Sequence, residues 1–418
     1  MDHFRTREGS LFVEDFPISQ LASLYGSPCY VYSKAILTQN FLNFHNALGS
    51  HPHRICYAVK ANGALALLQT LNQLGAGFDI VSEGELARVQ KATFKTNHII
   101  FSGVGKTKTE LEAALLANIF CFNIESEDEL MCLQKLAQDK NQKAPISFRI
   151  NPNVDAKSHP FLSTGNLESK FGIPIDTAPS LYLKAKSLSH IEIKGIACHI
   201  GSQITTLLPF LDALDKLLAL KNTLAQHNIH ITHLNLGGGL GVPYTKESPP
   251  TILDYTQSIF EKVKTYKDLE IIIEPGRAIV ANAGILITQV IRTKTHGSKH
   301  FCIVDAGMND LIRPMLYGAQ HKIEPVISSN QPQLLYDVVG PVCETSDIFA
   351  KNCALRISTG DFLAIHTTGA YGFCMSSNYN SRVRAPEVMV DGNKHFCIRQ
   401  REAIPDLFAS ERLLPEEA

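Results

Sequence analysis

A lysine at the end of a short apolar run has the clearest potential for chemistry in this sequence. Residues Ile55–Val59 predict a buried strand, so Lys60 would emerge at its C-terminal end among apolar neighbours. Burial disfavours the ammonium form, which leaves a free amine able to form a Schiff base with a carbonyl or with pyridoxal phosphate. The alternative is a lysine that ends a strand and extends into water.

A glycine run and a carboxylate at two later strand ends could complete a cofactor site around this lysine. The run Gly237–Gly241 lets backbone N–H groups converge on an anion, and Arg277 adds positive charge. Glu274 could hold a protonated pyridine nitrogen, and His199, at another strand end, could stack on the ring. The alternatives are a flexible turn, a structural Glu274–Arg277 ion pair and a buried core histidine.

The elements that must position these residues alternate regularly between about residues 35 and 280. Strand-like runs, separated mostly by helical patterns, centre near Tyr57, Asp79, Ile100, Cys121, Phe148, Ala197, Leu234 and Ile272. Four helices should start at capping boxes or close variants, namely Ser82–Glu85, Thr107–Glu110, Ser126–Glu129 and Thr251–Asp254. The pattern predicts a (β/α)8 TIM-type barrel over residues 33–280, with an open doubly wound sheet as the alternative.

Closure of the barrel would place the candidate residues on one rim. The eighth strand then lies beside the first, so Glu274 and Lys60 should be neighbours, and the fold often holds a phosphate after strands seven and eight. The stretch 151–172 after the fifth strand has no periodicity of its own and predicts a functional loop.

The rest of the chain predicts a second, mainly β domain. Short β-type segments replace the helical periodicity after residue 281. They are Ile285–Ile291, Phe301–Asp305, Leu335–Val339, Phe362–His366 and Val388–Val390. The N-terminal strands have no place in the barrel count, so we expect residues 1–32 and 281–418 to form this domain together.

Composition excludes several classes of function. The chain has 418 residues, 44% of them hydrophobic, with a formal net charge of -1. It has no long basic run, which disfavours nucleic acid or an anionic membrane as a partner. Its ten cysteines include no C-x-x-C pair, and residues 1–14 lack an apolar signal core, so we expect a cytoplasmic protein with reduced thiols and a small-molecule substrate. No metal site is predicted.

The motifs together resemble the pyridoxal-phosphate decarboxylases of the alanine-racemase fold, and in particular the diaminopimelate decarboxylase family. The barrel motifs are Tyr57–Asn62, Asn151–Lys157, Ser163–Gly165, Lys170–Gly172, His199–Gln203, Gly237–Gly239 and Glu274–Arg277. The β-domain motifs are Asp305–Pro314, Gly340–Asp347 and Gly369–Gly372. The resemblance covers nearly the whole chain.

This resemblance implies a role for each candidate residue. Lys60 would carry pyridoxal phosphate covalently, with His199 covering the ring. The other cofactor-binding residues would be Asp79, Ser202, Gly238, Gly239, Glu274, Gly276, Arg277 and Tyr371. Cys343 would donate the proton that replaces the lost carboxylate, in a homodimer where Cys343 and Glu344 enter the barrel of the partner. From its residue type alone, Cys343 would be a buried small hydrophobe.

Substrate choice depends on charges far from the reacting carbon. Diaminopimelate carries a second ammonium and a second carboxylate, so its site needs both signs of charge. Arg277 and Arg313 would bind the distal carboxylate and Glu344 the distal ammonium, with Tyr317 and Tyr371 also contacting the substrate. The alternatives are pairing of Arg313 with Asp310 or Glu344, a decarboxylase for ornithine, arginine or carboxynorspermidine, and a catalytically silent pyridoxal-phosphate-binding homologue.

Overall fold

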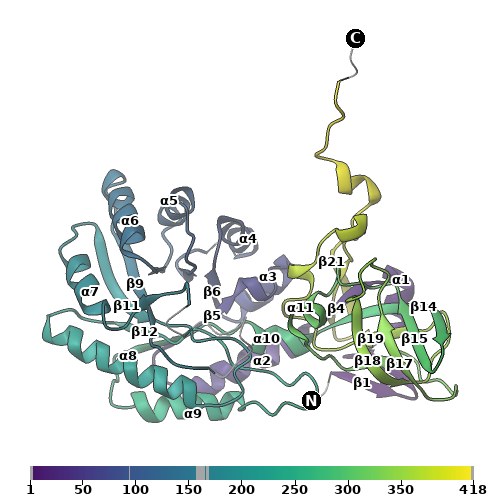
Figure 1. The fold of residues 1–418 in the computed structure, drawn as a ribbon. Helices are drawn as coiled ribbons and strands as arrows, with labels where there is room; N and C mark the ends of the chain where they lie inside the picture. Colours follow the sequence, from purple (N-terminus) through teal and green to yellow (C-terminus); the bar gives the residue numbers. More distant parts are fainter. Residues whose placement is uncertain (1–2, 94, 157–164, 166–168, 416–418) are drawn as a thin grey trace. The chain divides into compact units, whose positions relative to one another are not determined.

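The computed structural model describes residues 3–93, 95–156, 165 and 169–415, which form two compact units (Figure 1). One unit contains Ile36–Ala281, and the other combines Met1–Ala35 with Asn282–Ala418. Of the predicted 151–172 loop, residues 157–164 and 166–168 lie outside the described part, and with them Lys157, Ser163 and Thr164 of the family motifs.

The first unit is a closed barrel of eight parallel strands, which confirms the predicted fold class. The strands are β5 (His53–Ala58), β6 (Gly77–Ile80), β7 (Ile99–Phe101), β8 (Cys121–Ile124), β9 (Ala144–Asn151), β11 (Ile191–Ala197), β12 (His233–Asn235) and β13 (Glu270–Ile273). Pairing of β13 with β5, and of β8 with β9, closes the ring. The open doubly wound sheet is therefore excluded. A two-residue strand, β10 (Ile173–Pro174), adds to the edge of β9.

Helices follow the strands and cover the barrel (Figure 1). They are α2 (Lys34–Leu48), α3 (Leu65–Gln73), α4 (Glu83–Thr93), α5 (Lys108–Leu116), α6 (Glu127–Asp139), α7 (Ala178–Lys186), α8 (Leu208–Gln226), α9 (Ile252–Val263) and α10 (Arg277–Val280). The predicted boxes at Thr107 and Thr251 are complete. At Ser126 the hydroxyl caps its helix, but the Glu129 carboxylate accepts from Glu125 instead, which makes this start a variant of the motif.

The second unit contains a large sheet in the order β18-β17-β15-β14-β4-β20-β21. Its strands are β4 (Cys29–Ser33), β14 (Gly284–His296), β15 (Lys299–Val304), β17 (Leu334–Val339), β18 (Ile348–Leu355), β20 (Glu387–Asp391) and β21 (Lys394–Arg399). Two shorter strands, β16 (Ile323–Pro325) and β19 (Phe362–Ile365), pair with each other, and β19 also pairs with β14.

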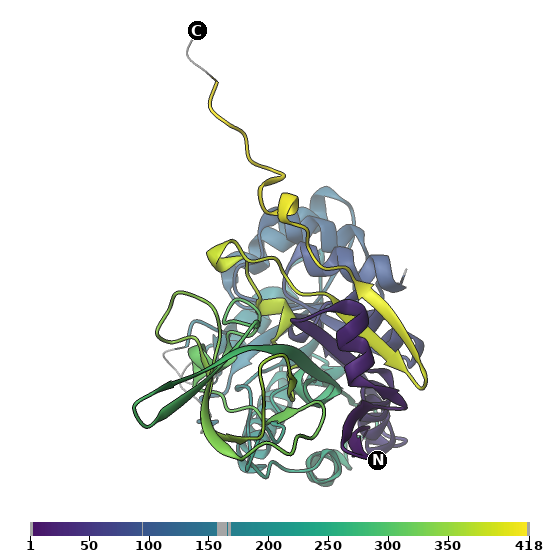
Figure 2. The ribbon, with the colours of Figure 1, turned by 90° about the vertical axis from the view of Figure 1, so that its right-hand side faces the viewer.

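The N-terminal segment contributes to this second unit. Strand β4 lies between β14, to which it is antiparallel, and β20, to which it is parallel (Figure 2). Before it come the small sheet β1 (Phe4–Arg7), β2 (Ser10–Val13) and β3 (Phe16–Pro17), and the helix α1 (Ile18–Tyr25). Helix α1 ends at Gly26, which adopts the left-handed φ of +67° that favours glycine.

Two further features bear on function. The short helix α11 (Arg313–Tyr317) follows β15 in the second unit. Over the residues that the structure describes, no helix combines the length and the apolar character needed to span a membrane.

Candidate active site

Lys60 lies at the C-terminal end of the first barrel strand and pairs with a buried carboxylate. Strand β5 ends at Ala58, and the single turn Val59–Ala61 that follows it presents the lysine. Its Nζ lies 2.6 Å from Oδ2 of Asp79, a fully buried residue of the neighbouring strand β6. The sequence-based expectation of a desolvated amine is incomplete, because Asp79 supplies a negative charge that stabilises the ammonium form.

Glu274 follows β13 and is the second buried carboxyl of this rim. Its side chain is 6% exposed, and its Oε1 accepts a hydrogen bond of 2.5 Å from Nδ2 of Asn235. Burial, and secondarily the negative charge of Asp79, raise the pKa of Glu274 to about 8, although the positive charge of Lys60 opposes that shift. Without a further cation the carboxyl of Glu274 holds its proton at neutral pH.

His199 follows β11 and is held in one tautomer. The backbone N–H of Gly238 donates to its Nδ1 at 3.1 Å, so the proton of the neutral ring is on Nε2. Burial lowers the pKa of His199 well below its ordinary value, and the positive charges of Arg149 and Lys60 act in the same direction. The imidazole is therefore neutral and presents an N–H group rather than a charge.

The glycine turn after β12 leaves no room for side chains at two positions. A Cβ atom on Gly238 would lie 2.3 Å from the carbonyl oxygen of Glu274. Gly239 has a φ of +111°, and a Cβ there would lie 2.5 Å from the carbonyl oxygen of Gly201. Only glycine satisfies both requirements, so the backbone can approach a ligand closely here.

Arg277 begins α10 and is 5% exposed. Its guanidinium donates to the hydroxyl of Tyr244, and its Nη2 donates to Oγ of Ser202 at 3.1 Å. The preceding Gly276 packs closely against the Lys60 turn, because a Cβ there would lie 3.0 Å from the Cβ of Ala61. These contacts connect Arg277 to the rim residues contributed by β11 and β5.

Several residues of this rim carry no motif that sequence reasoning used. Asn235 and Tyr244 are examples, since their partners Glu274 and Arg277 lie tens of residues away. Arg149 of β9 forms a buried ion pair of 2.8 Å with Glu125, which directly follows β8. Arg149 and Glu125 could have been predicted from their positions in the sequence, because a charged residue at the C-terminal end of a barrel strand lies on the active rim.

The remaining predicted residues belong to the second unit. Arg313, the first residue of α11, is 3% exposed, and its Nη1 lies 3.0 Å from Nε2 of His321. Tyr317 ends α11, and Tyr371 has a left-handed φ of +53°.

Cys343 and Glu344 lie in the turn that connects β17 to β18, and both are exposed. The backbone N–H of Cys343 donates to Oδ1 of Asn380 at 2.9 Å, while the carboxylate of Glu344 accepts a hydrogen bond from the hydroxyl of Tyr379. The exposure contradicts the expectation, drawn from residue type alone, that Cys343 is a buried small hydrophobe.

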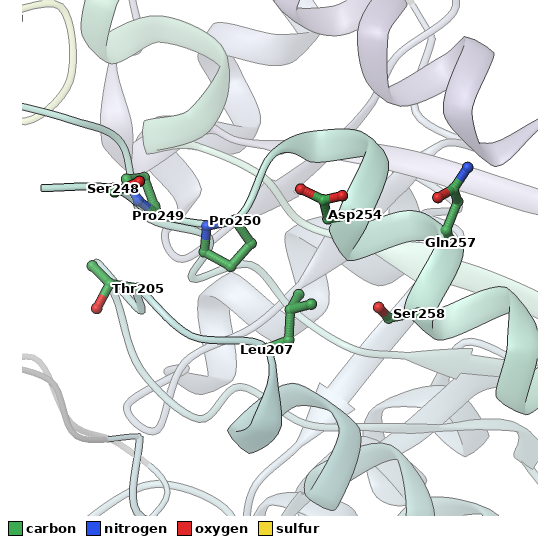
Figure 3. A pocket seen from close by; sticks show the side chains of 8 residues that line it. All are labelled: Thr205, Leu207, Ser248, Pro249, Pro250, Asp254, Gln257 and Ser258. Atoms are coloured by element: carbon green, nitrogen blue, oxygen red, sulfur yellow. The ribbon is translucent and has the colours of Figure 1, made fainter.

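A separate surface pocket contains none of the predicted residues. Its cavity volume is about 370 Å³, and its lining comes from the segment before α8 and from the start of α9 with the residues before it (Figure 3). Leu207, Pro250 and Asp254 are among the lining residues, and Asp254 already caps α9. This pocket is therefore not the candidate site.

Comparison with known proteins identifies the family. Residues 34–281 match the family described as pyridoxal-dependent decarboxylase, pyridoxal binding domain. Diaminopimelate decarboxylase of Vibrio cholerae is 52% identical over 417 residues, which cover 100% of both chains. This chain belongs to the diaminopimelate decarboxylase family. The chain is thus a pyridoxal-phosphate-dependent decarboxylase.

Solved structures of the diaminopimelate decarboxylase family have the same fold. The enzyme from Helicobacter pylori, complexed with L-lysine, is 43% identical with a TM-score of 0.91, over 94% of this chain and 99% of that one. The enzyme from M. jannaschii, in co-complex with L-lysine, is 35% identical with a TM-score of 0.95, over 99% of this chain and 98% of that one.

Three observations show that the barrel rim fits pyridoxal phosphate. No Cβ fits at Gly239 in the glycine turn, so the backbone N–H of this residue can approach a phosphate closely. Oδ1 of Asp79 is buried and lacks a hydrogen-bond partner among the described residues, so a ligand atom could satisfy it. Glu274 has a raised pKa that a cationic ring nitrogen would lower.

Proposed function

We propose that this chain decarboxylates meso-2,6-diaminopimelate to L-lysine and carbon dioxide, the last step of lysine biosynthesis. The observation that carries the proposal is the Lys60–Asp79 ion pair beside the buried Glu274, on the rim of a barrel fold shared over its full length with diaminopimelate decarboxylases. This arrangement supplies an amine for the cofactor and a carboxyl for its ring nitrogen.

The barrel residues would hold the cofactor in a fixed orientation. Bound pyridoxal phosphate supplies an electron sink for the electron pair that remains when carbon dioxide leaves. Lys60 would attach the cofactor covalently, and the glycine turn at Gly238 and Gly239 would bind its phosphate through the backbone N–H of Gly239, with Ser202, Gly276 and Arg277 beside it, because the N–H of Gly238 already donates to His199. Asp79 would hold the amine of Lys60 at the rim.

Two buried residues would control protons at the ring. Glu274 would face the ring nitrogen of the bound cofactor, where a cationic nitrogen would compensate for the unfavourable burial of its negative charge. His199 covers one face of the ring as a neutral imidazole, because Gly238 holds its Nδ1. The neutral imidazole of His199 would carry no positive charge. Glu274 would therefore be the proton donor beside the ring nitrogen of the cofactor.

The second unit would recognise the distal head of diaminopimelate. Arg277 and Arg313 would bind the distal carboxylate, since a guanidinium matches a carboxylate with two parallel hydrogen bonds. Glu344 binds the distal ammonium. Tyr317 and Tyr371 complete the set of substrate contacts.

We further propose a cytoplasmic homodimer in which Cys343 protonates the substrate carbon in the partner's site. Its support is the exposure of Cys343 and Glu344 together on one turn, which leaves both accessible to a second copy. No disulfide joins cysteines of the described residues, and proteins of reducing compartments rarely contain one.

The reaction is tested by measuring carbon dioxide and lysine from purified protein with added pyridoxal phosphate. Meso-diaminopimelate should react, whereas ornithine, arginine and lysine should not. Preference for another amino acid would leave the barrel roles intact and disprove the roles of Arg313 and Glu344. If no substrate reacts although the cofactor binds, the chain is a silent homologue.

The shared site is tested by complementation between two inactive variants. Lys60→Ala removes cofactor attachment, and Cys343→Ala removes the proton donor but should leave the cofactor bound. Co-expression should restore about a quarter of the wild-type activity, because half of the dimers are mixed and each mixed dimer has one intact site. Co-expression of Lys60→Ala with Glu274→Gln is the control and should restore none, since both changes damage the barrel.

A further inference from the structure

The turn that carries Cys343 and Glu344 is held from its inner side by a buried carboxylate. Asp347 is 2% exposed, and it accepts hydrogen bonds of 2.8 Å from the backbone N–H groups of Val342 and Met308. These bonds fix the two ends of the turn. They do not contact the side chain of Glu344 or the peptide N–H of Cys343.

Two consecutive residues hold the outer side of the same turn. The hydroxyl of Tyr379 donates to Oε1 of Glu344, and Oδ1 of Asn380 accepts the N–H of Cys343 at 2.9 Å. Each proposed functional residue therefore has its own partner on one neighbouring segment, residues 377–384, which we call the 377–384 loop.

The 377–384 loop is itself tied to the body of the second unit. The Ser377 N–H donates to the carbonyl of Asn309 at 2.8 Å, and Nη2 of Arg382 donates to the carbonyl of Asp305 at 2.7 Å. Asn378 bonds Glu402 at 2.7 Å. Because the loop is fixed at three points, its Tyr379 can hold the side chain of Glu344 in one position.

Its conformation at the centre is an unusual one. Asn380 and Ser381 have left-handed φ values of +57° and +52°. Such values are unfavourable for residues with a Cβ atom and persist where surrounding contacts impose them.

We infer that Tyr379 and Asn380 are positioning residues for the reaction proposed above, acting through Glu344 and Cys343 respectively. Tyr379 occupies Oε1 of Glu344 and leaves Oε2 to face the distal ammonium of the substrate. An exposed glutamate without this bond samples several rotamers, and only some of them present the carboxylate to a ligand. Asn380 fixes the backbone from which the Cys343 thiol extends.

Removal of the Tyr379 hydroxyl should weaken binding without slowing the chemistry. In Tyr379→Phe, KM for meso-diaminopimelate should rise roughly three- to tenfold, with kcat changed less than about twofold. Binding of L-lysine to the holoenzyme, measured by calorimetry, should weaken by the same factor, because lysine keeps the head that is not decarboxylated. Tyr266→Phe removes a half-buried tyrosine hydroxyl of the barrel unit and should change neither value.

A double-mutant cycle separates positioning from a general structural effect. Glu344→Gln alone should weaken lysine binding, and adding Tyr379→Phe to it should have no further effect, because the carboxylate that Tyr379 orients is gone. Additive losses in the double variant would overturn the inference for Tyr379.

For Asn380 the test compares two substitutions that tolerate its backbone conformation. Asn380→Asp keeps an acceptor oxygen and should retain kcat within about twofold, whereas Asn380→Gly keeps the φ but loses the acceptor and should lower kcat roughly tenfold at unchanged lysine affinity. Equal kcat in both variants would disprove the role of Asn380. Failure of the wild-type protein to decarboxylate diaminopimelate or bind lysine would instead disprove the proposed function.

Discussion

The charge of Glu274 shows how neighbours determine the chemistry of a single residue. Its carboxyl is buried beside Asp79, so its pKa is raised to about 8. In the unfolded chain the same group ionises near its ordinary value of 4.5. Between these two values the folded protein binds one proton more than the unfolded chain, so rising pH favours unfolding.

Glu274→Gln should therefore remove a pH-dependent loss of stability from the cofactor-free protein. The amide has nearly the shape of the protonated carboxyl but cannot ionise. The melting temperature of the variant minus that of the wild type should increase from pH 4.5 to pH 8, measured by thermal unfolding without pyridoxal phosphate. With saturating cofactor, kcat should fall roughly a hundredfold. A temperature difference that is constant with pH would show that Glu274 is ionised in the folded protein.

The role of Lys60 could be predicted from the sequence, because this residue lies at the end of a predicted strand and within a family motif. Sequence reasoning did not reach Asn235 or Tyr244, whose partners Glu274 and Arg277 become neighbours only when the barrel closes. It also treated burial as the only influence on Lys60. The compensating charge of Asp79 lies on the adjacent strand. Its Oδ2 comes within 2.6 Å of Nζ of Lys60 only when the two strands pair in the folded barrel.

At the scale of elements, barrel strands were predictable because each is an apolar run followed by a helix start. Strands β18 and β21 were missed because their sequences, such as Ile348–Leu355, mix exposed lysine and asparagine with apolar residues. Such strands form because neighbouring strands are available to pair with them. Their own composition gives little indication of a strand.

The glycine turn after β12 permits a test at this scale. Gly239→Ala places a Cβ 2.5 Å from the carbonyl of Gly201 at a φ of +111°, so the turn must move. The dissociation constant of pyridoxal phosphate should increase at least about tenfold, measured by fluorescence titration.

A matched control separates backbone strain from loss of the phosphate site. Gly75→Ala meets a similar φ of +93° with nothing within 4 Å. Gly75→Ala should lose about 1–2 kcal/mol of stability and Gly239→Ala at least as much, but only Gly239→Ala should lose cofactor affinity. Equal affinities would show that this turn does not bind the phosphate.

At the scale of the whole molecule, the two compact units need not unfold together. All the barrel residues proposed to hold the cofactor lie within Ile36–Ala281. In differential scanning calorimetry, pyridoxal phosphate at about 100 times its dissociation constant should raise the transition of this unit by roughly 5–10 °C. In the Lys60→Ala variant, the same transition should no longer shift when pyridoxal phosphate is added. A shift unaffected by Lys60→Ala would place the principal cofactor contacts elsewhere.

The position of β4 has a consequence for how the chain is made. The ribosome releases Cys29–Ser33 early, but both of its sheet neighbours, Gly284–His296 and Glu387–Asp391, emerge only after the entire barrel. This apolar strand must therefore wait through most of translation with its hydrogen-bonding edges open, while the strands that follow it already find their partners. Strand β4 is the first strand of the large sheet to be synthesised, but its hydrogen bonds to both neighbours are among the last to form.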